Sequence, residues 1–320
     1  MEIIRDPRAC PPRPAGTAVT IGAYDGVHRG HQAVIAAVRE TARRRDLQTA
    51  VVTFDRHPAS VVRPESAPKL LTDLDQRLQL LEIAGVDLTV VVPFDEERAR
   101  ESAEDFIETV LVDCLEARLV VVGADFHFGH RRRGDVELLT SEGARHGFDV
   151  EGMELVGADW HEAAPDGRVS STLIRRSLIE GDVVRAAVLL GRHHEVRGTV
   201  ATGDQRGREL GFPTANLEVD DQIQLPADGV YAAWYVRSNG DIHPAAASLG
   251  RRPTFYDEQP HSLVEAHLLD ADLDLYGELA GVQFVERLRG QVKFASVDEL
   301  VDQMHRDVER TRTILGVGGE

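Results

Sequence analysis

The sequence lacks the features of several special classes of protein. Its two cysteines, Cys10 and Cys114, are too few for a disulfide framework, so a reducing cytoplasm is the simplest compartment to expect. No apolar run approaches the roughly 20 residues that a membrane helix needs. The start, Met1 to Asp6, lacks the basic start and the apolar core of a signal peptide. We therefore expect a globular cytoplasmic protein with no membrane partner.

Lysine is nearly missing, since Lys69 and Lys293 are the only two lysines among 36 basic residues. With 54 acidic residues, the formal net charge is −18, which disfavours nucleic acid as a partner. A Gly-x-x-x-x-Gly-Lys-Ser/Thr phosphate loop is also absent. Any phosphate must therefore be bound by backbone N–H groups, histidine, arginine or a metal ion.

The first part of the chain alternates apolar runs with amphipathic segments. The runs are Ala18–Ile21, Ala50–Phe54, Leu88–Val92 and Leu119–Val122, and the helical patterns between them are Gln32–Arg44, Asp73–Ala84 and Ala103–Cys114. Such alternation predicts βαβ units, an α/β fold and a parallel sheet. Ligands of such sheets bind at the carboxyl ends of the strands, near a switch in strand order.

The pattern changes near residue 190, after a helical region that is interrupted at Gly181-Asp182. The later strand-like runs are short and separated by turns: Glu195–Ala201, Gly229–Val236, Ala245–Leu249, Leu263–Leu269 and Gln283–Leu288. This pattern predicts a small antiparallel β-barrel. A last helix, Ser296 to Ile314, begins with the Ser and Glu of a capping box. The length suggests about two domains, and we place them at residues 1–184 and 185–320. Self-association does not follow from the sequence, although it is compatible with it.

The densest signal in the first half is the segment from Gly22 to His31, Gly-Ala-Tyr-Asp-Gly-Val-His-Arg-Gly-His, between an apolar run and an amphipathic one. A glycine-rich turn before a helix aims backbone N–H groups at one point, which suits a phosphate. His28 and His31 are three residues apart and would share a helix face. Surface positions or zinc ligation are alternatives for such a pair, but the glycine-rich entry favours contact with phosphate.

Three more segments are expected at the same edge of the sheet. Thr53 to Pro58 and Gly123 to Gly129 each follow a predicted strand, although the phenylalanines of the second segment could simply be core residues. Ser170 to Arg175 reads Ser-Ser-Thr-Leu-Ile-Arg at the start of a helix. Hydroxyls there are commonly helix caps, but with free N–H groups and an arginine they also make a pyrophosphate clamp.

The second half contains two candidate groups. Gly203 to Asn216 combines glycines, which let the backbone approach phosphates closely or merely shape a turn, with Thr214 and Asn216. The last two point to one side of an extended segment and offer oxygen ligands for Mg²⁺. Glu265 shares a strand face with His267. A solvent-facing glutamate is the ordinary interpretation, and a general base is the alternative.

These motifs, in this order, resemble a known family. The His-x-Gly-His turn followed by Ser-Ser-Thr-x-x-Arg is similar to the nucleotidyltransferase superfamily. Gly-x-x-Asp-Gly-Val-His-x-Gly-His and Gly-x-Asp-Phe-x-Phe-Gly resemble the bacterial bifunctional riboflavin kinases/FMN adenylyltransferases, or FAD synthetases. Pro213-Thr214-Ala215-Asn216 and Glu265 are similar to the ATP–Mg²⁺ motif and the base of riboflavin kinases. Similarity also extends to Arg252–Phe255, Tyr276-Gly277 and Asp307, so it covers nearly the whole chain.

The resemblance implies a Rossmann-like nucleotidyltransferase domain followed by a riboflavin kinase barrel with a terminal helix. It implies ATP and riboflavin as substrates, Mg²⁺ as cofactor, FMN as intermediate and FAD as product. Glu265 would activate a riboflavin hydroxyl, and the phosphates in the first domain would be stabilised by His28, His31, Ser171, Thr172 and Arg175. Further expected contacts are Gly22, Asp25, Gly26, Gly30, Gly203, Gly207 and Arg208 for nucleotide, Phe54, His57 and Asp125 for flavin, and Thr214 and Asn216 for the metal ion.

Three positions depart from the pattern of that family. Tyr24 replaces a common Phe, Arg192-His193-His194 stands where Arg-Pro and an aromatic residue are usual, and Ser248 stands where Asn often occurs. A rival interpretation is an adenylyltransferase for pantetheine phosphate or nicotinamide nucleotide, but such chains do not include the predicted barrel. Another is a non-catalytic flavin-binding paralogue, against which the presence of the expected catalytic residues argues.

Overall fold

A computed structural model describes residues 1–153, 169–202, 210–250, 263–271 and 273–318. The chain divides into two compact units, Met1–Ser171 and Thr172–Glu320. Within the described residues, no helix combines the length and the hydropathy that crossing a membrane requires.

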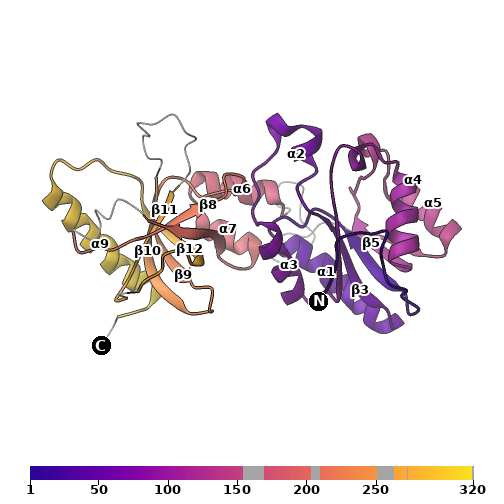
Figure 1. Ribbon diagram of the computed structural model, residues 1–320, viewed down its shortest axis with the longest axis horizontal. Helices are drawn as coiled ribbons and strands as arrows, with labels where there is room; N and C mark the ends of the chain where they lie inside the picture. The colour runs from indigo at the N-terminus through magenta and orange to yellow at the C-terminus, as the bar shows by residue number, and fades with distance from the viewer. Residues whose placement is uncertain (154–168, 203–209, 251–262, 272, 319–320) are drawn as a thin grey trace. The chain divides into compact units, whose positions relative to one another are not determined.

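The first unit is built on a six-stranded parallel sheet with the order β1-β4-β3-β2-β5-β6 (Figure 1). Its strands are β1 (Glu2–Ile4), β2 (Thr17–Ile21), β3 (Gln48–Phe54), β4 (Leu88–Val92), β5 (Ala117–Gly123) and β6 (Asp149–Met153). Its helices are α1 (Arg29–Arg45), α2 (Ala59–Val62), α3 (Leu74–Ile83), α4 (Ala103–Phe106) and α5 (Val136–His146). A π-helix, η3 (Ile107–Cys114), continues α4, and three short 3₁₀ segments are η1 (Pro64–Ser66), η2 (Arg98–Arg100) and η4 (His130–Arg132).

Burial on both faces explains why the central strands are continuous apolar runs. Successive residues of β3 point to opposite faces of the sheet. Val52 joins a core with α4 and η3, whereas Val51 joins a core with α1 and α3. The four predicted strands of this half are confirmed. The sequence did not predict β1 and β6, which form the two edges of the sheet, because β1 has only three residues and β6 is mostly exposed.

The switch in strand order lies between β2 and β5. From β2 the chain proceeds to β3 and β4 on one side, and then returns to add β5 and β6 on the other side. The turn that begins at Gly22 leaves β2, and the segment that contains Asp125 leaves β5, so the two begin on either side of this switch. The sheet therefore provides the ligand-binding edge that the sequence predicts.

The second unit contains a closed antiparallel barrel with the order β10-β11-β8-β7-β12-β9 (Figure 1). Its strands are β7 (His194–Ala201), β8 (Ala215–Val219), β9 (Gly229–Val236), β10 (Ile242–Gly250), β11 (Leu263–Leu268) and β12 (Leu279–Arg289). Two helices, α6 (Ser171–Glu180) and α7 (Val183–Leu190), precede it, and α9 (Val297–Leu315) follows it. The predicted helix break, barrel and capped terminal helix are confirmed, the last by the Glu299 N–H that donates to the Ser296 hydroxyl.

The sequence did not predict that the two cysteines are paired with each other. The structure joins Cys10 and Cys114 by a disulfide, with their Cα atoms 5.0 Å apart, within the usual range for such a bond. Cys10 packs against the core to which Cys114, at the end of η3, belongs. The fold thus brings together two residues that are 104 positions apart in the sequence, and the cysteine count alone gives no sign of this proximity.

Candidate functional site

His28 and His31 lie against each other at the start of α1. Their rings are stacked with centroids 3.6 Å apart, and the Tyr24 ring lies 4.8 Å from that of His31. His28 is the N-cap residue of α1, and its Nδ1 accepts a hydrogen bond from the His31 N–H at 3.3 Å. A ring nitrogen that accepts cannot carry a proton, so the neutral His28 ring has its proton on Nε2. This tautomer leaves Nε2–H as a hydrogen-bond donor.

The turn before these histidines has an unusual backbone. Tyr24 and Val27 have φ values of 50° and 38°, and Gly26 has 82°. Positive φ is strained for a β-branched residue such as Val27, and strain of this kind gathers at functional sites. The Gly26 N–H donates to the Thr72 hydroxyl at 3.1 Å. Contacts of this kind hold the turn in its strained conformation.

Asp25 is almost fully buried within the same turn. Its carboxylate accepts hydrogen bonds from the N–H groups of Leu71 and Thr72 at 2.9 and 3.2 Å. Its backbone oxygen accepts from the Ser171 hydroxyl at 2.9 Å. Asp25 therefore stabilises the turn and binds Ser171, which belongs to the predicted pyrophosphate clamp.

The other expected contacts in the first unit lie in the segments after β3 and β5. Phe54 ends β3 and packs edge-on against Phe94, and the His57 Nδ1 accepts from the Ala59 N–H at 3.1 Å. Asp125 is exposed in the segment after β5. The core alternative is correct for the nearby phenylalanines: Phe128 belongs to the core, and Phe126 is stacked on it and partly buried.

The first turn of α6 contains the rest of the predicted clamp. Ser171 and Thr172 are the first residues of this helix, and Arg175 follows one turn later. The division between the two units falls between Ser171 and Thr172. Arg175 is 9% exposed, whereas Thr172 is exposed. The three residues thus share one helix start.

In the barrel, β8 and β11 place the metal and base candidates side by side. Asn216 and Glu265 are direct partners in the antiparallel pair, so their side chains lie on the same face about 5 Å apart at Cβ. Glu265 is also the direct partner of Ser248 on β10. The alternating residues Val264, Ala266 and Leu268 fill the barrel core. Asn216 and Glu265 therefore lie on the outer face of the barrel.

Asn216 is only 7% exposed although it lies outside the barrel core. Thr214, two residues earlier, is half-buried. The His267 Nδ1 lies 2.8 Å from the Pro213 oxygen, which fixes the segment that leads into β8, and burial lowers the pKa of His267. Gly203, Gly207 and Arg208 lie outside the described residues, as does the segment Arg252–Phe255.

Sequence reasoning missed Arg77 on α3. This side chain is 1% exposed, and burial lowers its pKa while Asp25, Asp73 and Asp55 oppose that shift. A signal was available in the sequence, because Arg77 lies on the same helix face as Leu74, Leu78 and Leu81. An arginine among apolar positions indicates a buried polar contact.

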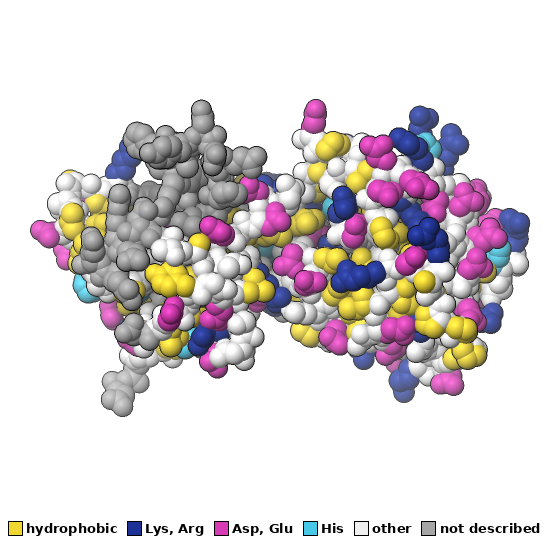
Figure 2. All heavy atoms as spheres, viewed as in Figure 1, with side chains coloured by type: hydrophobic (Ala, Val, Ile, Leu, Met, Phe, Trp, Pro, Cys, Tyr) yellow, Lys and Arg dark blue, Asp and Glu magenta, His cyan; other side chains and the backbone are white. Residues whose placement is uncertain are grey.

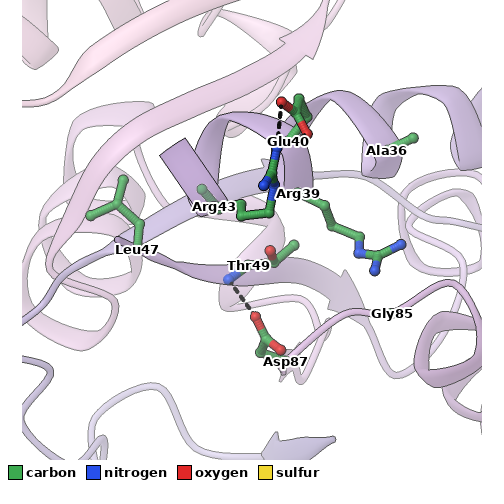
Figure 3. A pocket seen from close by; sticks show the side chains of 9 residues that line it. Ala36, Arg39, Glu40, Arg43, Leu47, Thr49, Gly85 and Asp87 are labelled. Carbon is green, nitrogen blue, oxygen red and sulfur yellow. Dashed lines mark hydrogen bonds and ion pairs between the residues drawn. The ribbon is translucent and has the colours of Figure 1, made fainter. Parts of the chain in front are cut away.

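A cavity of about 410 Å³ lies elsewhere in the first unit (Figure 3). Arg39, Glu40 and Arg43 of α1 line it together with Thr49 and Asp87, which lie at the amino ends of β3 and β4. The predicted site lies at the carboxyl ends of these strands. This cavity is therefore separate from the predicted site. Among the described residues, no group of three His, Cys, Asp or Glu side chains could hold a metal ion. The described residues therefore provide no third ligand of these types for zinc at His28 and His31.

Two family models match the chain in succession. One, described as FAD synthetase, matches residues 10–172, and the other, described as riboflavin kinase, matches residues 190–315. Proteins named bifunctional riboflavin kinase/FMN adenylyltransferase are similar over more than nine tenths of the chain. The one from Haemophilus influenzae is 36% identical over 94% of both chains, and that from Listeria monocytogenes is 37% identical over 93% of this chain and 92% of the relative.

A solved structure also shares the whole fold. It is described as a macrolide-efflux protein from Streptococcus pneumoniae, is 31% identical, and covers 97% of this chain and 98% of its own with a TM-score of 0.84. The sequence and fold comparisons thus cover both units.

Proposed function

The chain belongs to the family of bifunctional riboflavin kinases/FMN adenylyltransferases, and from this premise we propose which residues perform each of its two reactions. The enzyme phosphorylates riboflavin to FMN with ATP, and it then adenylylates FMN to FAD with a second ATP. The proposal assigns the first reaction to the barrel and the second to the parallel sheet. It takes residues 185–320 and 1–184 as the two functional domains.

For the kinase reaction, Glu265 is the general base. Its carboxylate takes the proton of the ribityl 5′-hydroxyl, and that oxygen attacks the γ-phosphate of ATP while the bond to the β-phosphate oxygen breaks. ADP is the leaving group. The observation that most supports this role is the pairing of Glu265 with Asn216, because it puts a carboxylate beside an amide on one face. Positioning and charge neutralisation supply most of the catalysis in such transfers.

The residues beside Glu265 fit a magnesium ion. The hydroxyl of Thr214 and the amide oxygen of Asn216 are hard oxygen donors, which Mg²⁺ prefers, and Mg²⁺ takes few protein ligands. Asn216 is largely shielded from solvent, so its amide is held in place. When bound, Mg²⁺ would neutralise the negative charge of the ATP phosphates. Gly203, Gly207 and Arg208 come shortly before Thr214 in the sequence, and we assign them to binding of the nucleotide.

For adenylyl transfer, an oxygen of the FMN phosphate attacks the α-phosphate of ATP, and pyrophosphate leaves. This nucleophile is already an anion, so no strong base is needed. Donors that stabilise charge as it develops on phosphorus are the chief requirement. His28 would contribute its Nε2–H, since its Nδ1 accepts from the His31 N–H, and His31, Ser171, Thr172 and Arg175 complete the set.

The remaining assignments in the first unit follow from their positions. Gly22, Asp25 and Gly26 of the turn, and Gly30 in the first turn of α1, would shape the nucleotide pocket, Asp25 through its bracing contacts. Flavin would contact Phe54, His57 and Asp125. Phe54 ends β3, His57 follows it, and Asp125 follows β5, which lies on the other side of β2 in the sheet.

The proposal extends to partners and compartment. ATP is a cytoplasmic metabolite and both reactions consume it, so we place the enzyme in the cytoplasm. Nucleic acid is not a partner in this proposal, since the net charge is −18 and acidic and basic side chains are interspersed on the face of the first unit in Figure 2.

The metal assignment is tested with Asn216→Ala. The change removes one oxygen ligand, so the Mg²⁺ concentration for half-maximal FMN formation should rise on the order of tenfold. Conversion of FMN to FAD should not change. Glu218→Ala is the matched control, because Glu218 is an exposed residue two positions later on the same strand. An unchanged Mg²⁺ requirement in Asn216→Ala would remove Asn216 from the metal site.

A further inference from the structure

The buried guanidinium of Arg77 lies at the carboxyl edge of the sheet. Its Nη1 donates to the Ala23 oxygen at 3.2 Å, to the Thr53 hydroxyl oxygen at 3.3 Å and to the Phe54 oxygen at 2.8 Å. The Thr53 hydroxyl donates in turn to the Ala23 oxygen at 3.1 Å. One nitrogen therefore binds three oxygens from two neighbouring strand ends.

These oxygens belong to the two segments that contain the proposed binding residues. Ala23 is the second residue of the turn that leads from β2 to His28, and Phe54 is the last residue of β3, three positions before His57. β2 and β3 are paired in the sheet up to Ile21 and Val52. Arg77 and Thr53 extend this link beyond Ile21 and Val52, where the ladder between β2 and β3 has ended.

An arginine is an expensive residue for this position. Leu74, Leu78 and Leu81 occupy the same face of α3, and an apolar residue at 77 would continue that face with no cost of removing a charge from water. Asp25, Asp55 and Asp73 provide compensating negative charge. The three hydrogen bonds at Nη1 offset part of the free-energy cost of burying this charge. A general gain in stability would not require that these contacts lie at the site.

We propose that Arg77 is a positioning residue for adenylyl transfer, which fixes the phosphate-binding turn after β2 relative to the flavin-side segment after β3. The inference rests on the proposed assignment of that reaction to the first unit. Because Arg77 is buried, we assign it no direct contact with substrate. It acts through Ala23 and Phe54, whose oxygens it binds, and so sets the approach of the FMN phosphate to the α-phosphate of ATP.

Loss of Arg77 should disturb the geometry of the adenylyl-transfer site and not only the stability of the fold. Displacement of a bound reactant by about 1 Å can cost on the order of 100-fold in rate. Loss of Arg77 should therefore lower kcat for FAD formation and raise the KM for FMN. FMN formation in the barrel should continue at its normal rate. The kinase reaction of the same chain is thus an internal control for enzyme concentration and handling.

The test compares Arg77→Met, Arg77→Lys and Thr53→Val with the unaltered chain. Rates of FAD formation from FMN, and of FMN formation from riboflavin, are measured along with chemical unfolding. Arg77→Met should lower kcat for FAD formation 10- to 100-fold. Arg77→Lys, which keeps one charged nitrogen donor, should recover most of the rate. Arg100→Met is the matched control, since the Arg100 side chain is 72% exposed, and it should change neither reaction.

Thr53→Val keeps the test decisive if Arg77→Met does not fold. It preserves the shape of a fully buried side chain and removes the hydroxyl that joins Arg77 to Ala23, so kcat for FAD formation should fall about fivefold. If Arg77 and Thr53 only stabilised the fold, these variants would lower the free energy of unfolding and leave kcat and KM of the folded enzyme unchanged. That result would overturn the proposal.

The failure of this inference can be told apart from failure of the proposed function. If His28→Ala with His31→Ala abolishes FAD formation while the Arg77 and Thr53 variants keep normal kcat and KM, only the role of Arg77 is refuted. If the histidine variant keeps full FAD formation, the site assignment itself is refuted.

Discussion

Among single residues, His194 shows how burial decides the ionisation of a side chain. It lies at the start of β7, stacked on Phe284, with Nε2 2.9 Å from the Gln224 oxygen. Burial lowers the pKa of His194 to about 4, with a smaller contribution from Arg192 in the same direction, while the Gln224 contact and Glu195 oppose the shift. The ring is therefore neutral in the folded barrel, with its proton on Nε2.

This shift predicts that acid destabilises the second unit. The unfolded chain binds a proton near pH 6.5 and the folded chain only near pH 4, so the stability from neutral His194 is present above pH 6.5 and is lost as the pH falls toward 4. Between pH 7 and pH 5 this group should reduce the free energy of unfolding by about 2 kcal/mol. Denaturant unfolding at a series of pH values measures the effect.

His194→Phe is the matched variant for that experiment, because it keeps an aromatic ring and removes the titrating group. Its unfolding free energy should depend less on pH over this interval than that of the unaltered chain. Equal pH dependence in the two proteins would show that His194 is not the group responsible.

The candidate site residues that the sequence could indicate are those whose side-chain type suggests a chemical role. His28, His31, Asn216 and Glu265 could be selected because a glycine-rich turn and a strand alternation give their direction, and the structure brings each pair together. The contacts of Asp25 and Arg77 could not be predicted. Their partners, Leu71, Thr72, Ala23 and Phe54, are distant in the sequence, and only the packed fold shows that the carboxylate and the guanidinium are buried.

At the scale of elements, periodicity predicted most of the buried strands and the helices α1, α3, α6, α7 and α9, but it did not predict α5. Strand β8 was missed as an element, although its first residues were recognised as an extended segment with one polar face. The break of the α4 helix into the π-helix η3 was also missed, because its residues share one apolar pattern across Phe106 and Ile107. Hydrogen-bond register within a helix is not visible in hydrophobic spacing.

The contact between β7 and β8 gives a prediction for the barrel. A Cβ added at Gly198 would lie 2.4 Å from the Glu218 oxygen, so the strands can approach this closely only with glycine. Gly198→Ala should lower the free energy of unfolding of the barrel by about 1–3 kcal/mol. It should also reduce FMN formation, because Asn216 is held in register by the same pair of strands.

Chemical unfolding and riboflavin kinase rates measure these two effects. Thr199→Ala is the control, since Thr199 is the next residue of β7 and is exposed. A Gly198→Ala protein with unaltered stability would mean that the strands can separate without cost, contrary to this account.

At the scale of the whole molecule, the order of the motifs identified the family before any element was placed. The α/β fold, the barrel and the terminal helix were all predicted, and both family models match in the same order. The disulfide between Cys10 and Cys114 was not predicted, because it depends on which loop packs on which helix end. Composition fixes the classes to which a chain can belong, but it does not fix such pairings.

The central claim is that one chain performs two reactions with two separate sets of residues. The most direct test is chromatography of the products formed from riboflavin, ATP and Mg²⁺. Glu265→Ala should form no FMN from riboflavin, yet it should convert added FMN to FAD. His28→Ala combined with His31→Ala should accumulate FMN and form no FAD. If either folded variant lost both reactions, or kept both, the assignment of the two sites would be contradicted.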